Sequence, residues 1–188
     1  MSYINDHQQQ FMDLKFHLGN QDQLRRQANG GNSILFSYPP NEEQLYIEKS
    51  KELYPDNAEF IDISKLLVQF IDECEYEGDL GWNAIAKYYI DFQLTPHLIF
   101  RSDDPTPDLF DLIISKIESA CLNDKIPFLI RTGCLFGTGI ENVNIMEHKA
   151  VMKLPHPLVF FYPSKIEDDN IYFLNFKLAS KYRCTLVK

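Results

Sequence analysis

The chain has 188 residues, of which 45% are hydrophobic and 13% aromatic, which is enough apolar material for the core of one domain of ordinary size. Its formal net charge is -9, so the chain as a whole repels nucleic-acid phosphates and we expect no direct nucleic-acid partner. No run approaches the roughly 20 apolar residues of a membrane helix, and the first residues resemble no secretory signal, so we expect a cytoplasmic protein that contacts no membrane.

The N-terminal segment, 1–30, is predicted to be helical and to pack on the rest of the domain. A narrow apolar stripe runs along 5–27, and a run rich in Asn and Gly then ends the helix. An apolar strand follows at 33–38, and Pro39 and Pro40 end it.

Strands and helices then alternate to the end of the chain. Asn41 is the candidate N-cap of the helix after the first strand, and Ser64 that of the helix after the second. Three prolines in 95–108 predict a surface loop there. We expect helices at 41–53, 64–74, 82–92, 108–122 and 141–152, and strands or short extended elements at 58–63, 126–131, 157–163, 171–174 and 181–187.

This alternation predicts an α/β domain with a three-layer αβα architecture, in which a mostly parallel sheet lies between two layers of helices. The strands at 126–131 and 157–163 contain almost no polar residues, which is typical of strands that are covered on both faces. No repeat or low-complexity linker divides the chain, so we expect a single domain over 1–188.

The candidate site lies at the carboxyl ends of the strands, where parallel sheets bind ligands. Tyr38, Asp62, the segment 131–139 and Tyr162 all follow or end a predicted strand and are expected to converge. The most distinctive segment is the turn GCLFGTG, because a glycine-rich turn between a strand and a helix can direct backbone amides at an anion. Its candidate anion- or partner-binding residues are Arg131, Gly133, Gly137, Thr138 and Gly139.

The turn lacks the lysine of a nucleotide-hydrolysing loop. Gly137 is followed by Thr138 and Gly139, where a phosphate loop needs Lys and then Ser or Thr, and the dinucleotide pattern G-x-G-x-x-G is also missing. The turn follows a middle strand, whereas phosphate loops follow the first. A structural turn or partner-contact loop is therefore favoured, and a nucleotide-binding or hydrolysing domain is the alternative.

No catalytic motif or metal-ligand spacing is present, so we expect no enzyme activity, no metal and no cofactor. The histidines form no H-x-x-x-H pair, the cysteines no C-x-x-C pair, and no serine lies in G-x-S-x-G. Asp62 stands alone at its strand end, where an aspartate more often caps the next helix than acts as a base. Candidate protein-interface residues are the loop acids Asp103 and Asp104 and the strand-end tyrosines Tyr38 and Tyr162.

Several short segments, taken in order, resemble the BrxB family, the small B component of bacterial BREX bacteriophage-resistance systems. They are Tyr38-Pro39, Arg131 to Gly133, Phe161-Tyr162-Pro163 and Tyr182-Arg183. Ser164 departs from the family, which usually has glycine there. The resemblance covers most of the chain from about Ile34 onward.

The resemblance implies a degenerate relative of nucleotide-binding, P-loop-like α/β domains, without established enzyme activity. It also implies a cytoplasmic accessory subunit that associates with the alkaline-phosphatase-like PglZ subunit and other BREX subunits. The functional expectation is therefore a non-catalytic interaction subunit of a phage-defence complex.

Overall fold

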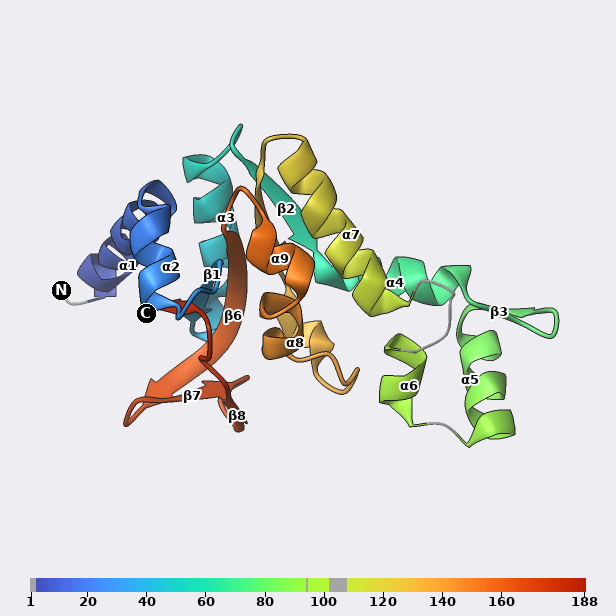
Figure 1. Ribbon diagram of the computed structural model, residues 1–188. Helices are drawn as coiled ribbons and strands as arrows, with labels where there is room; N and C mark the ends of the chain where they lie inside the picture. Colours follow the sequence, from blue (N-terminus) through green and yellow to red (C-terminus); the bar gives the residue numbers. More distant parts are fainter. Residues whose placement is uncertain (1–2, 94, 102–107) are drawn as a thin grey trace.

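The computed structural model describes residues 3–93, 95–101 and 108–188, and it has a parallel sheet at its centre (Figure 1). The parallel strands lie in the order β2 (Ala58–Asp62), β5 (Ile126–Ile130), β6 (Leu158–Glu167), β1 (Ser33–Tyr38) and β9 (Thr185–Val187). Most residues of these strands are apolar, and β1 is buried along its whole length. The expected α/β class and mostly parallel sheet are confirmed.

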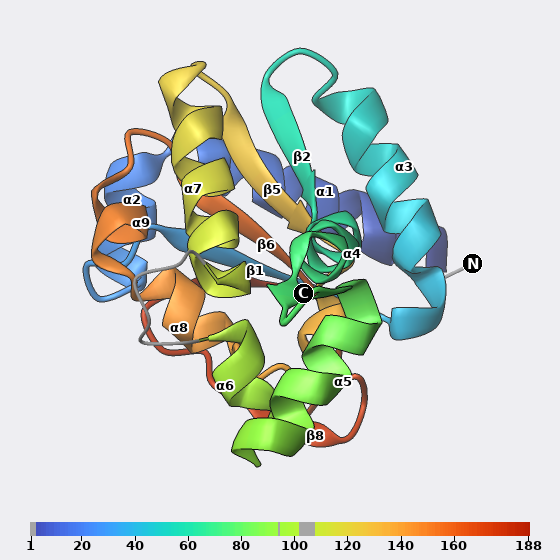
Figure 2. The ribbon, with the colours of Figure 1, turned by 90° about the vertical axis from the view of Figure 1, so that its right-hand side faces the viewer.

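Helices pack on both faces of this sheet (Figures 1 and 2). One face carries α1 (Tyr3–Gly19), α2 (Gln21–Gln27), the 3-10 turn η1 (Pro40–Glu42) and α3 (Glu43–Leu53), and the other carries α4 (Ile63–Glu73), α7 (Leu109–Leu122), α8 (Asn142–Met146) and α9 (Lys149–Lys153). Side chains alternate between the faces along each strand. Phe36 and Phe161 pack toward the first layer, and Leu35 and Phe160 toward the second.

The central strand β6 is longer than expected, because it runs through Pro163 to Glu167. There it pairs antiparallel with β7 (Asn170–Phe173), which pairs with β8 (Lys177–Ala179). Proline lacks only the amide donor, and the Pro163 carbonyl still accepts a hydrogen bond of 2.8 Å from the Leu174 amide. The expectation that Pro163 ends the strand is therefore wrong.

Two helix starts also differ from expectation. Asp62, and not Ser64, caps α4, which confirms the capping role favoured for Asp62: its Oδ1 accepts hydrogen bonds from the amides of Ser64 at 3.1 Å and Lys65 at 3.3 Å. The Ser64 hydroxyl itself donates to Asp62 at 2.6 Å. Asn41 lies inside the 3-10 turn, and α3 begins at Glu43 without a side-chain cap.

A projection that we call the arm extends away from the sheet (Figure 1, right). It consists of the hairpin β3 (Glu75–Tyr76) and β4 (Asp79–Leu80), the helix α5 (Gly81–Phe92) and the short helix α6 (Pro96–Phe100). The latter replaces part of the loop expected at 95–108, since proline is well accommodated in a first helical turn. None of the helices in the described ranges has the length and apolar character that a membrane crossing requires.

Candidate functional site

The strand ends converge as expected, and Arg131 links them. Asp62 is in register with Ile130 on the neighbouring strand, so Arg131 follows directly beside it. The Arg131 Nε lies 3.4 Å from Asp62 Oδ2, and its Nη2 donates a hydrogen bond of 3.1 Å to Gln44 Oε1 on α3. Arg131 thus connects β5, the start of α4 and the helix layer on the opposite face of the sheet.

Burial determines the chemistry of the two other groups at this edge. The Tyr38 hydroxyl donates a hydrogen bond of 2.8 Å to Glu43 Oε1, and burial, reinforced by the Glu43 charge, raises the pKa of Tyr38. Burial, followed by the Asp62 charge, raises the pKa of Cys134 to about 11. The Cys134 thiol is therefore protonated at neutral pH and is a poor nucleophile.

The polar groups at this edge are thus occupied by one another. Asp62 caps a helix and pairs with Arg131, while Glu43 accepts from Tyr38 and Gln44 from Arg131. Within the ranges that the structure describes, no group of three or more His, Cys, Asp or Glu side chains is placed to hold a metal ion. The arrangement stabilises the strand ends.

The glycine-rich turn folds back on itself. Its first residues form the 3-10 helix η2 (Thr132–Leu135), and the Thr132 hydroxyl donates to the Phe161 carbonyl of β6. Thr138 is buried, donates to the Leu135 carbonyl at 2.8 Å and accepts from the Ile140 amide at 3.2 Å. The amides that are bonded to other groups of the same turn are those of Cys134, Phe136, Thr138 and Ile140.

The glycines of this turn serve its backbone conformation. Gly137 has a φ of 89° and Gly139 a φ of 79°, values that side chains rarely tolerate. Gly133 lies close to β6, since a Cβ there would be 3.6 Å from Pro163 Cγ. The turn displays Phe136, whose half-exposed ring contacts the exposed ring of Phe176 edge-on, with centroids 5.3 Å apart.

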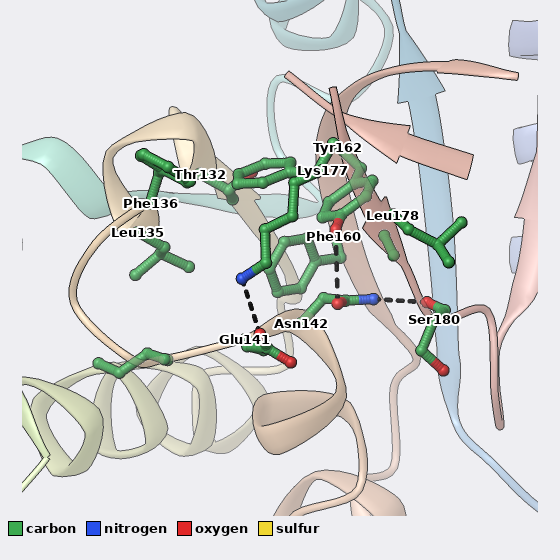
Figure 3. A pocket seen from close by; sticks show the side chains of 13 residues that line it. Thr132, Leu135, Phe136, Glu141, Asn142, Phe160, Tyr162, Lys177, Leu178 and Ser180 are labelled. Atoms are coloured by element: carbon green, nitrogen blue, oxygen red, sulfur yellow. Dashed lines mark hydrogen bonds and ion pairs between the residues drawn. The ribbon is translucent and has the colours of Figure 1, made fainter. Parts of the chain in front are cut away.

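A small pocket lies between this turn, α8 and β8 (Figure 3). Its volume is about 50 Å³, well below the roughly 300 Å³ at which small-molecule sites begin. Lys177 Nζ pairs with Glu141 Oε1 at 2.7 Å across its mouth, and Asn142 donates to the Ser180 carbonyl at 2.8 Å (Figure 3). The pocket is too small for a nucleotide.

Two of the four candidate interface residues are buried. Tyr38 is 1% exposed and Tyr162 4% exposed. Tyr162 stacks on Phe173 with ring centroids 4.7 Å apart. Asp103 and Asp104 lie outside the described residues.

Several exposed apolar side chains that the sequence did not reveal lie on the arm. The spacing of Ile85, Tyr88, Tyr89 and Phe92 in α5 is typical of the buried side of a helix. Ile85 is buried, but Tyr89 and Phe92 are exposed, because α5 packs mainly on the small hairpin and on α4 and not on the sheet. The large apolar side chains exposed on the arm are Leu80, Trp82, Tyr89, Ile90, Phe92 and Leu98.

The arm is also acidic. Its hairpin carries Glu75, Glu77 and Asp79, and Asp91 lies on α5. Lys87 is held by two of these acids, at 2.8 Å from Glu77 and 3.4 Å from Asp79. The arm therefore combines apolar side chains with a surplus of negative charge.

Comparison of the chain with family models, with curated proteins and with solved structures finds no significant match.

Proposed function

We propose that this protein is a non-catalytic subunit that binds a partner protein through its arm. The observation that carries the proposal is the exposure of large apolar side chains there, above all Trp82 at 65% and Ile90 at 69%. Tryptophan is enriched among the residues that dominate binding energy at protein interfaces. Contiguous exposed apolar groups rimmed by polar ones are typical of interaction sites.

The strand ends support the non-catalytic part of the proposal. An enzyme of this architecture would keep an acid, base or nucleophile available there. Asp62 and Arg131 are instead paired with each other, and the Cys134 thiol has a raised pKa. In the turn that follows β5, the amides of Cys134, Phe136 and Thr138 are bonded to carbonyls of the same segment and are not available to a phosphate.

The partner that the resemblance to the BrxB family suggests is the PglZ phosphatase-like subunit of a cytoplasmic BREX complex. A partner surface complementary to the arm would be apolar at its centre and basic at its rim, because the arm carries Glu75, Glu77, Asp79 and Asp91. The phage-defence role rests on this resemblance.

We further propose that the domain is a degenerate relative of P-loop-like nucleotide-binding domains. Strand β1 lies inside the parallel sheet, between β6 and β9, and a helix follows it. The connection after it is Pro39-Pro40-Asn41, without the glycines and lysine of a phosphate loop. Prolines there remove amide donors that a phosphate would need.

Co-purification tests the function. The chain would be co-expressed with a tagged PglZ subunit from the same genome and compared with the double variant Trp82→Asp/Ile90→Asp. Leu122→Asp is the matched control, since Leu122 is 87% exposed but lies on α7, outside the arm. We expect the wild type and the control to co-purify with PglZ, and we expect the arm variant not to co-purify. Retention of the arm variant would contradict the proposal.

A further inference from the structure

A second apolar surface is a groove between α1 and α3. These two helices lie on the opposite side of the molecule from the arm (Figure 1). Its volume is about 550 Å³. Phe11 and Tyr46 form a buried floor with ring centroids 5.8 Å apart. The Tyr46 hydroxyl donates to Gln10 Oε1 at 2.7 Å, which ties the two helices together. These contacts hold α1 and α3 together at the floor of the groove.

The walls of the groove are exposed apolar side chains. Met12 lies on α1, and Leu45 and Leu53 lie on α3. Each of these three side chains is about half exposed. Leu45 and Leu53 are eight residues apart, which places them on one face of the helix and separates them by about 12 Å along its axis. This distance spans about two helical turns.

The charged residues that line the groove are two lysines, Lys15 and Lys49. The imidazole of His7 also lines it, and no acidic residue does. His7 is paired with Glu42 and Lys49 with Glu52, whereas Lys15 forms no ion pair among the residues that the structure describes. In a chain with a net charge of -9, an apolar groove with a basic lining selects for an acidic partner.

We propose that this groove binds an amphipathic helix of a partner protein, with acidic side chains on either side of its apolar stripe. The two-turn spacing of Leu45 and Leu53 matches anchors at i and i+7 on a docked helix. Strand addition does not fit, because the groove is bounded by two helices and offers no sheet edge. This site is separate from the arm and does not depend on the function proposed for it.

The probe is a fluorescein-labelled designed peptide of about four helical turns, with leucines at i, i+3, i+4 and i+7 and glutamates beside them. A second peptide has lysines in place of the glutamates. Fluorescence anisotropy would measure the binding of both peptides to the full chain. We expect the glutamate peptide to bind at least about tenfold more tightly than the lysine peptide, and the difference to shrink at high salt.

Variants of the chain test whether the peptide binds in the groove. Leu45→Asp should weaken the binding of the glutamate peptide about tenfold or more, and Lys15→Glu should weaken it several-fold. Both residues are exposed, so we expect both variants to fold. Leu122→Asp and Lys116→Glu, both exposed on α7, are the matched controls and should leave binding unchanged. Trp82→Asp should also leave it unchanged, which separates this site from the arm.

Three results of the peptide experiments would overturn the proposal. They are no saturable binding at millimolar peptide, equal binding of the two peptides, and binding that Leu45→Asp leaves intact. Sedimentation of the chain alone addresses one further occupant, since the acidic, apolar arm of a second copy has matching chemistry. Self-association that Leu45→Asp abolishes would assign the groove to a second copy and overturn the assignment to a partner helix.

Discussion

Replacement of Asp62 distinguishes a structural carboxylate from a catalytic one. Its Oδ1 caps α4 and its Oδ2 lies 3.4 Å from Arg131 Nε. Loss of a capping oxygen costs about 1 kcal/mol, and this partly exposed ion pair adds about 0.5 kcal/mol. We expect Asp62→Ala to lower the free energy of unfolding by about 1.5 kcal/mol. Asp62→Asn keeps a capping oxygen and should lower it by only about 0.5 kcal/mol.

Urea denaturation followed by far-UV circular dichroism measures these differences. Asp72→Ala is the matched control on the same helix, because Asp72 is exposed, and it should stay within about 0.5 kcal/mol of wild type. A gain in stability on Asp62→Ala would refute the reasoning, since functional carboxylates are commonly held at a cost to stability. Equal losses in the two Asp62 variants would show that the charge, and not the cap, dominates.

Three further predictions concern the turn that follows β5. Gly137→Ala should lower the free energy of unfolding by about 1 kcal/mol, because its φ is 89° and the site is otherwise open; Gly19→Ala, at a glycine without positive φ, is the control in the same denaturation series. Cys134 should be alkylated slowly at neutral pH, as followed by peptide mass spectrometry, and fast alkylation there would contradict a pKa of about 11. Because burial raises the pKa of Cys134 from 9.0 to about 11, the neutral thiol stabilises the folded state fully below pH 9.0. This contribution is lost as the pH rises through about 11. Millimolar ATP or GTP should leave the thermal midpoint unchanged, whereas a ligand at a hundred times its Kd would add roughly 2.7 kcal/mol and revive the nucleotide-binding alternative.

The central strands could be predicted from the sequence because each is a short apolar run between turn residues. β1 has the expected bounds, and β5 differs by one residue. The convergence of Asp62 and Arg131 could also be predicted, because neighbouring parallel strands end at the same edge of a sheet. The continuation of β6 beyond Pro163 could not, since it depends on the Leu174 amide, which is distant in sequence.

The exposed surfaces could not be predicted from the sequence. Helical periodicity identifies an apolar face but not whether another element covers it. Tyr89 and Phe92 follow the periodicity of a buried face yet are exposed, because the arm holds too few elements to cover them. Leu45 and Leu53 have the same pattern and line an open groove. Conversely, Tyr38 at the end of β1 and Tyr162 within β6 are both buried in the core.

Hydrogen–deuterium exchange of the purified complex with PglZ shows whether the arm is the binding surface. We expect slower amide exchange in 75–93 and 95–101 on binding, with no change along α7 around Leu122. Unchanged exchange in the arm would contradict it, and protection confined to the turn around Phe136 would locate the partner on the Phe136–Phe176 pair instead.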